Sequence, residues 1–287
     1  MMKTIIACTD FSAAARNASH YAAILAKSLD ARLVLVSAYQ PDPVVPDETP
    51  VIVSTEEMKK FTDEQLKREV VRLHAAPGHH VFTDSRLGFA SDAILDAAKD
   101  WKAELLVAGM KSEGKKLRRI FGSTVTALAR KSKCPMIVVP ENAIYEKPVA
   151  IALAYESDAS PEADPHVLDV LRIIAERFAS SVFLIHFSNS SYKEAFAVLN
   201  KPFRLQKMLG NLQPEVENVG GKDIAAALDK FIAGNEINML AMMPQKHSLM
   251  ERFFMPGVTR QLIFASSVPV LVLPGLKEEG QAKHRAG

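Results

Sequence analysis

Short runs of apolar residues alternate along the chain with longer stretches in which apolar residues recur every three to four positions. Such short runs predict buried strands, and the three-to-four spacing predicts amphipathic helices. In the first half, the runs predict strands at residues 4–9, 33–36, 81–87, 105–108 and 136–139. The intervening stretches predict helices at 12–29, 56–75, 91–102 and 123–131, with Ser12 and Ser91 as N-terminal caps.

The second half repeats this order of elements. Its apolar runs predict strands at residues 149–154, 182–185, 215–219, 239–242 and 270–273. Helices are predicted at 165–178, 193–209, 223–232 and 258–265, and Pro202 should kink or split the second of these.

Two local matches indicate an internal duplication. Residues 133–140 resemble 267–274, and residues 105–108 resemble 239–242 at the same offset of 134 residues. Continuous apolar strands that alternate with helices favour a parallel sheet covered on both faces, joined by right-handed crossovers. The predicted fold class is therefore α/β, with two doubly wound, Rossmann-like five-stranded parallel-sheet domains in tandem. We place the first domain at 1–143, the second at 147–276 and a polar tail at 277–287.

Composition and charge narrow the class of partner. The 287 residues are 48% hydrophobic and 24% charged, with a formal net charge of +2. This composition is that of a globular protein, and the balanced charge supplies no broad positive field for nucleic acid. Cys8 and Cys134 lie in or beside apolar runs, so we expect two buried, reduced thiols and no metal site.

The sequence also bears on location. The apolar run near the N-terminus ends at Thr9 and Asp10, which is too short for the core of a signal peptide. No stretch approaches the roughly 18 apolar residues of a membrane helix. We therefore expect a cytoplasmic protein without a membrane partner.

The candidate site lies in the first half. In doubly wound sheets, ligands bind beyond the carboxyl ends of the strands where the strand order reverses, which here means the loops after the first and fourth strands. The residues in question are Thr9, Asp10, Ser12, Ala38, Gly109, Met110, Ser112, Gly114, Gly122, Ser123 and Thr124.

Each group of these residues suits part of a nucleotide. Glycines let the backbone approach an anion, and the helix start at Gly122, Ser123 and Thr124 offers free N–H groups to phosphate. Asp10 can accept hydrogen bonds from an adenine amine or a ribose hydroxyl, and the backbone near Ala38 could line a base pocket. Singly, Gly109 could be a turn residue, Ser123 a helix cap and Asp10 a cap of the first helix; together they favour a phosphate site.

A basic stretch follows the fourth strand. Gly109, Gly114 and Lys115 approach the P-loop spacing, but Lys116 stands where a magnesium-binding hydroxyl is needed, so we reject a P-loop. The basic residues are Lys111, Lys115, Lys116, Arg118 and Arg119. They form either a solvated helix or loop face or a phosphate-neutralising group. The absence of interleaved aromatic residues argues against nucleic acid.

At these residues the chain resembles the universal stress protein family, in two copies. Its ATP-binding members have Gly-x2-Gly-x9-Gly-Ser/Thr after the fourth strand and an Asp after the first. Here Gly109 and Gly122-Ser123 keep the outer spacing, Asp10 matches the Asp, Ser112 replaces the middle glycine and Gly114 follows it by two places. Such proteins commonly pair through their last strand. The resemblance therefore implies pairing of residues 137–139 with 271–273 inside this chain, with a homodimer as an open alternative.

The second copy departs from this pattern. Met243 stands at the position of Gly109, Tyr155 at that of Asp10, and Pro256-Gly257-Val258 at that of Gly122-Ser123-Thr124. Proline supplies no N–H donor and valine no hydroxyl, so we expect no ATP in this half.

The expected function is that of a universal stress protein which binds an adenine nucleotide, ATP or AMP with or without Mg²⁺, in its first domain. The resemblance, and not the chemistry, supplies the role in stress adaptation. We expect no enzyme, because the sequence offers no convincing catalytic base or metal carboxylate pair at the site. Two alternatives stay open, which are a ligand-free scaffold or dimerisation module and a slow ATPase.

Overall fold

The computed structural model describes residues 2–40, 54–73, 81–113, 118–119, 122–155, 165–187, 202–219, 224–242 and 268–274. The first half runs as β1 (Thr4–Cys8), α1 (Ala13–Leu29), β2 (Arg32–Tyr39), α2 (Thr55–Arg72), β3 (Val81–Leu87), α3 (Ala90–Asp100), β4 (Leu105–Met110), β5 (Ser112–Glu113), β6 (Arg118–Arg119), α4 (Ser123–Lys131) and β7 (Met136–Pro140). The second half runs as β8 (Ala150–Tyr155), η1 (Pro165–Leu168), α5 (Asp169–Phe178), β9 (Ser181–Phe187), α7 (Pro202–Met208), β10 (Glu215–Val219), α8 (Ile224–Gly234), β11 (Met239–Met242) and β12 (Val270–Val272).

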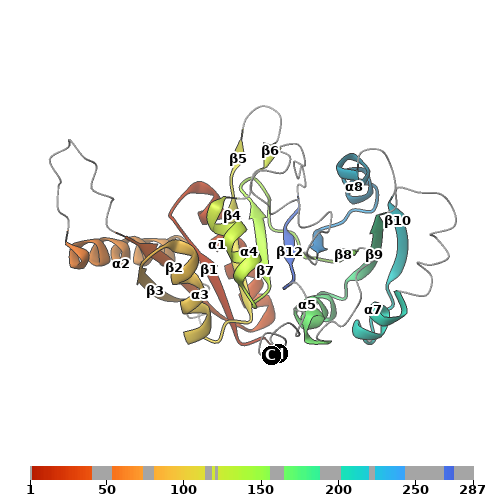
Figure 1. The fold of residues 1–287 in the computed structure, drawn as a ribbon, viewed down its shortest axis with the longest axis horizontal. Helices are drawn as coiled ribbons and strands as arrows, with labels where there is room; N and C mark the ends of the chain where they lie inside the picture. The colour runs from red at the N-terminus through yellow and green to blue at the C-terminus, as the bar shows by residue number, and fades with distance from the viewer. Residues whose placement is uncertain are drawn as a thin grey trace, which may run out of the picture.

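The strands of both halves form one ten-stranded sheet in the order β10-β9-β8-β11-β12-β7-β4-β1-β2-β3 (Figure 1). Within this sheet the strands of each half are parallel, and the order reverses beside the first strand, between β1 and β4 and between β8 and β11. β5 and β6 form a separate two-stranded sheet. The predicted doubly wound α/β class is therefore confirmed. The structure adds that the two five-stranded sheets are continuous with each other.

The halves join through their last strands. β7 and β12 pair in antiparallel fashion, with Ile137 opposite Leu271 and Val138 opposite Val270. This confirms the predicted pairing inside the chain, although the paired residues are 136–138 and 270–272 and not 137–139 and 271–273. The carboxyl end of β7 consequently lies beside the amino end of β12.

Two apolar layers cover the sheet. Because side chains alternate along a strand, Ile5 and Ala7 face one layer, with α1, α2, α5 and α7, while Ile6 and Cys8 face the other, with α3, α4 and α8. Each layer includes residues of both halves, so the hydrophobic core is continuous across the joint.

Local sequence explains where the main helices begin. The Ser12 hydroxyl accepts a hydrogen bond from the Ala15 N–H at 3.3 Å and caps α1, as predicted. Ser54 and Glu57 form a reciprocal capping box at the start of α2, which also lowers the pKa of the Glu57 carboxyl.

Other predicted boundaries were wrong. Ser91 does not cap α3, which begins at Ala90 after Phe89, because Gly88 turns the chain directly out of β3 with a φ of 128°. The helix expected from residue 165 starts as a 3-10 turn, η1. Of the helix predicted at 193–209, the described part is α7 (Pro202–Met208), and residues 193–201 lie outside the described residues. The helix predicted at 258–265 lies outside the described residues.

The predicted repeat recurs in backbone detail. The Leu106 N–H donates to the Pro135 carbonyl at 2.9 Å, and at the same offset of 134 residues the Leu240 N–H donates to the Pro269 carbonyl at 3.0 Å. Both bonds hold the entry of the last strand against the fourth strand of its half. The two halves therefore share local geometry as well as element order.

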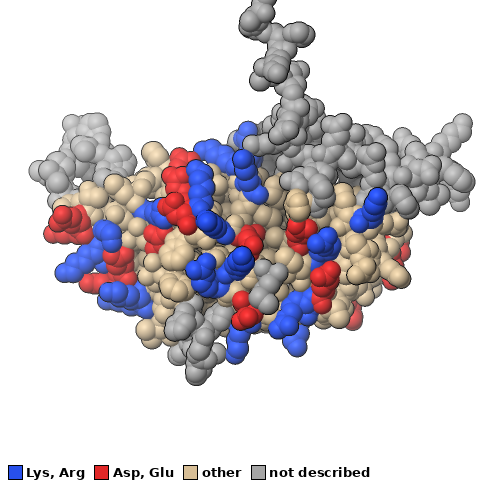
Figure 2. Space-filling view, turned by 90° about the horizontal axis from the view of Figure 1, so that it is seen from below, with Lys and Arg blue, Asp and Glu red and all other residues tan. Residues whose placement is uncertain are grey.

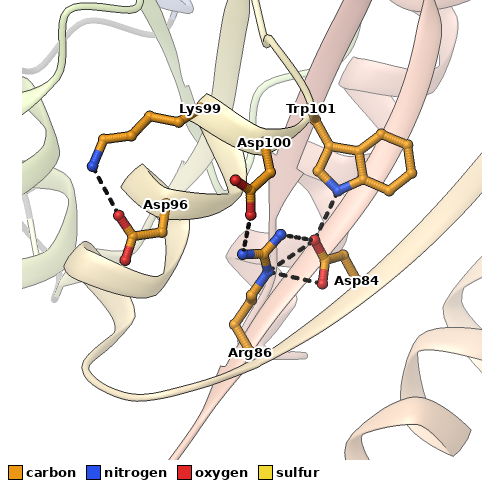
Figure 3. A network of polar contacts seen from close by, with 6 residues as sticks. All are labelled: Asp84, Arg86, Asp96, Lys99, Asp100 and Trp101. Carbon is orange, nitrogen blue, oxygen red and sulfur yellow. Dashed lines mark hydrogen bonds and ion pairs between the residues drawn. The ribbon is translucent and has the colours of Figure 1, made fainter.

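The outermost strand of the first half is fastened to the helix that follows it (Figure 3). The Asp84 carboxylate accepts hydrogen bonds from the Arg86 guanidinium at 2.7 Å and from Trp101 Nε1 at 2.7 Å, and Arg86 also donates to Asp100 at 2.6 Å. These bonds raise the pKa of the Arg86 guanidinium. Because an edge strand is a template for unwanted pairing, charged side chains directed at its own domain also protect it.

Candidate functional site

The loop after β1 is held by its own side chains. The Thr9 hydroxyl accepts a hydrogen bond from the Phe11 N–H at 3.0 Å, and Asp10 Oδ1 accepts one from the Ser12 N–H at 3.0 Å. Phe11 takes a left-handed conformation with a φ of 64°. Asp10 is exposed and contributes to this turn through one carboxylate oxygen, while the capping of α1 is left to Ser12.

The fourth strand is two residues longer than the sequence predicts. Gly109 and Met110 are not loop residues, because β4 continues through Met110, whose side chain is buried. A Cβ at Gly109 would lie 2.3 Å from the Ala14 carbonyl oxygen and 2.8 Å from the Ala15 nitrogen. The absence of a side chain at Gly109 therefore lets α1 pack closely on β4, which is a sufficient reason for glycine at this position.

The start of α4 matches the prediction. The helix begins at Ser123, with Gly122 as its N-terminal cap residue in extended conformation, φ −61° and ψ 162°. Among the described residues, no side chain caps the first N–H groups of this helix, and no atom lies within 4 Å of the place a Gly122 Cβ would occupy. Gly122 and Ser123 are exposed and Thr124 is half-buried, so this helix start offers backbone donors and hydroxyls at the surface.

The remaining predicted residues lie around these two elements. Ala38 is near the end of β2 and half-buried. Ser112 belongs to β5, which pairs with β6 in a two-stranded antiparallel ribbon, so Arg118 and Arg119 are strand residues and not part of a helix or loop face. Gly114 lies outside the described residues, and Lys111 is exposed at the foot of the ribbon.

The fold brings the two predicted loops to one edge of the sheet. β1 lies between β2 and β4 and runs parallel to both, with Cys8 beside Val36 and Ala108. The carboxyl ends of these strands therefore meet, with α1 starting on one face of the sheet and α4 on the other. This is the reversal of strand order at which doubly wound proteins bind ligands.

Neither thiol is set up as a nucleophile. Burial raises the pKa of the Cys8 thiol, directly before Thr9, to about 12, and that of Cys134 also to about 12. Cys134 in addition contacts the Ala103 carbonyl at 3.3 Å. Both thiols are therefore protonated at neutral pH. Cys8 is buried as expected, whereas Cys134 is half-buried.

One side chain beside the site was not singled out from the sequence. Asn17 in α1 donates hydrogen bonds to the carbonyl groups of Pro140 and Ala143, just after β7. The available signal was a lone carboxamide among the small apolar residues of this helix, which periodicity alone does not distinguish from a solvated position.

The charge on one face of the molecule is mixed in sign (Figure 2). Seen from below, basic and acidic side chains are interspersed on this side of the molecule (Figure 2). In the described part of the chain, no helix combines the length and the apolar character needed to cross a bilayer. Of the second copy, the positions Met243, Pro256, Gly257 and Val258 lie outside the described residues.

The geometry defines the class of protein as a two-copy, doubly wound α/β protein. Comparisons with known proteins agree with this class. Residues 1–140 match the model of the universal stress protein family. A universal stress protein of Thermus aquaticus is 30% identical over 141 residues, which are 48% of this chain and 99% of the relative. Universal stress protein Sll1654 of Synechocystis sp. is 30% identical over 141 residues, 49% of this chain and 87% of its own length.

The structural likeness extends over both halves. The crystal structure of a universal stress protein from Archaeoglobus fulgidus aligns with 94% of this chain and 98% of its own, with a TM-score of 0.70 and 16% identity. This likeness shows that the other protein has the same fold over both halves. The family model and the 30% identical relative show that the chain belongs to the universal stress protein family.

Proposed function

We propose that the first half binds an adenine nucleotide, ATP or AMP, and that the protein responds to nucleotide rather than turning it over. The observation that carries the proposal is the start of α4, where Gly122 brings no capping side chain, no other described side chain caps the first N–H groups, and Ser123 and Thr124 add hydroxyls. Such a helix start favours phosphate through its free donors and its dipole. Mg²⁺ would accompany ATP through the phosphate oxygens.

The loop after β1 supports the adenosine end of the same ligand. Thr9, Asp10 and Ser12 form a turn fixed by its own hydrogen bonds, next to the end of β4. A turn that is already ordered loses little entropy when it binds a ligand. In this proposal Asp10 meets the adenine amine or a ribose hydroxyl, and the backbone near Ala38 lines the base.

In this proposal the second half binds no nucleotide, and the first half binds nucleotide without catalysing a reaction on it. Met243, Pro256 and Val258 remove a glycine, a donor and a hydroxyl from the second copy. Family membership supplies the setting, which is stress adaptation.

A pair of substitutions at Gly122 tests the phosphate end. Gly122→Asp and Gly122→Asn each place a capping side chain where no described atom lies within 4 Å, so both variants should fold and stabilise α4 to a similar extent. Only the aspartate sets a negative charge against the phosphates, so it should weaken ATP binding about tenfold or more relative to Gly122→Asn. Equilibrium dialysis with ATP and AMP measures both, and Ser123→Ala should weaken binding by a smaller factor.

Three results would contradict the proposal. Equal ATP affinity of the aspartate and asparagine variants would show that the phosphates do not bind at the start of α4. Failure of the intact protein to bind millimolar ATP or AMP would favour a scaffold. Metal-dependent hydrolysis at ordinary enzyme rates, abolished by Asp10→Ala, would make the protein an ATPase. Acid release of nucleotide after mild purification, followed by chromatography, identifies which nucleotide the protein carries.

A further inference from the structure

The turn at residues 140–143, where the chain leaves the first half, is bonded to both elements that flank the candidate site. Asn17 Nδ2 in α1 donates to the Pro140 carbonyl at 2.9 Å and to the Ala143 carbonyl at 2.8 Å. The Glu141 N–H donates to the carbonyl of Met110, the last residue of β4, at 2.9 Å. The turn is therefore fixed to α1, the helix that Ser12 caps, and to β4, the strand that leads into the β5–β6 ribbon.

The same turn adjoins the joint between the halves. Pro140 ends β7, the strand that pairs with β12 of the second half. At the end of the turn, Ala143 is buried in the layer that contains α1, and beyond the turn the Tyr145 ring packs on Tyr21 with their centroids 5.0 Å apart. The chain then enters β8, so the turn sets the path from one half into the other.

A carboxamide suits this position. One amide nitrogen supplies two N–H donors, and here each donor meets a different backbone carbonyl. Alanine removes both donors, and an ionised aspartate of the same shape accepts but does not donate. Neither residue can replace Asn17 in these two bonds.

We propose that Asn17 is a positioning residue that couples occupancy of the nucleotide site to the joint between the halves. This inference rests on the proposed function. A nucleotide that binds against the turn after β1 and the end of β4 restrains the start of α1 and the Met110 carbonyl together. Because the 140–143 turn is bonded to both, its fluctuations are reduced as well, and with them those of the end of β7 beside β12.

Hydrogen exchange on the full chain, with and without saturating ATP, tests the coupling. The informative amides are those of Glu141 and Ala143, which bond to Met110 and Pro140, and that of Leu273, which bonds to Met242 in the second half. In the wild type, ATP should slow their exchange by about fivefold or more, the lower end of ordinary allosteric coupling. In Asn17→Ala, ATP should still bind within about threefold of the wild type, but slow these amides less than about twofold, because the coupling and not the site is removed.

Three controls separate the possible outcomes. Asn142→Ala changes an exposed residue of the same turn and should behave as the wild type. Gly122→Asp should fold without responding to ATP. Asn17→Asp replaces Asn17→Ala if the alanine variant does not fold.

The results distinguish this inference from the proposed function. ATP that binds by dialysis but leaves the exchange of Glu141, Ala143 and Leu273 unchanged overturns the coupling and leaves nucleotide binding intact. A response to ATP in the Asn17 variants equal to that of the wild type overturns the role of Asn17. Absence of ATP and AMP binding to the wild type overturns both proposals.

Discussion

Gly109→Ala is predicted to destabilise the protein severely, although it adds a single methyl group. The new Cβ would lie 2.3 Å from the Ala14 oxygen, 2.4 Å from the Ala14 carbon and 2.8 Å from the Ala15 nitrogen. All three atoms belong to the backbone of α1, so no side-chain rotation relieves the contact. Ordinary contact begins near 3.4 Å, so α1 has to retreat from β4 by roughly 1 Å.

The cost follows from what α1 buries. Its inward face includes Tyr21, Leu25 and Leu29, all buried against the sheet. A gap of up to 1 Å forfeits about a quarter to a half of the dispersion attraction between the atoms on either side. Overpacking usually costs about 1–3 kcal/mol, and the rigid obstacle here places this variant near or above the upper end, at about 3 kcal/mol.

Urea unfolding monitored by far-ultraviolet circular dichroism checks this value. With an m-value of about 3 kcal/mol/M, the midpoint should fall by about 1 M. Gly234→Ala is the matched control, because no described atom lies within 4 Å of its added Cβ and alanine favours the helix end, so its midpoint should stay or rise. A Gly109→Ala midpoint equal to that of the wild type, or an equal loss in Gly234→Ala, would show that close packing is not the reason for this glycine.

Two further predictions concern the edge strand and the thiols. Asp84→Ala should cost about 2 kcal/mol, because Arg86 and the indole N–H lose a half-buried charged partner, and should shift the fluorescence of Trp101, the single tryptophan, to longer wavelength. Asp84→Asn keeps an acceptor for the indole and should shift it less; equal stability of wild type and alanine variant would refute the role of this network. Cys8 and Cys134, with pKa values raised to about 12, should resist iodoacetamide at pH 8 when folded and react in urea, whereas fast labelling of the native protein would contradict these raised pKa values.

Much of the fold was predictable because local signals and tertiary structure agree. Ser12 begins α1 and Gly122-Ser123 begins α4 as capping preferences predict. The apolar runs at 105–108 and 239–242 became the fourth strands of their halves, at the expected offset. The family resemblance predicted a joint between 137–139 and 271–273, and the structure has it one position earlier on each strand, at 136–138 and 270–272. The apolar pattern alone does not show which strand edges meet.

The site was predictable in outline and not in its details. From the sequence, Gly109 is predicted to let the backbone approach a phosphate. The structure shows that the close packing of α1 on β4 requires a glycine here, and the sequence does not reveal that distance. Ser91 had the chemistry of a cap, yet the turn at Gly88 starts α3 one residue earlier. The β5–β6 ribbon formed in a basic stretch without the alternation that marks a strand, so periodicity gave no signal for it.

The antiparallel contact of β7 with β12 joins two unlike copies within one chain. Since both strands are parts of one polypeptide, each half always pairs with the other half of the same chain, at a local concentration that dilution does not lower. The loops of the second copy can then change their residues without loss of the joint, as long as β12 still pairs with β7. One chain thus maintains a fixed one-to-one ratio of unlike copies, which a pair of separate identical subunits cannot provide.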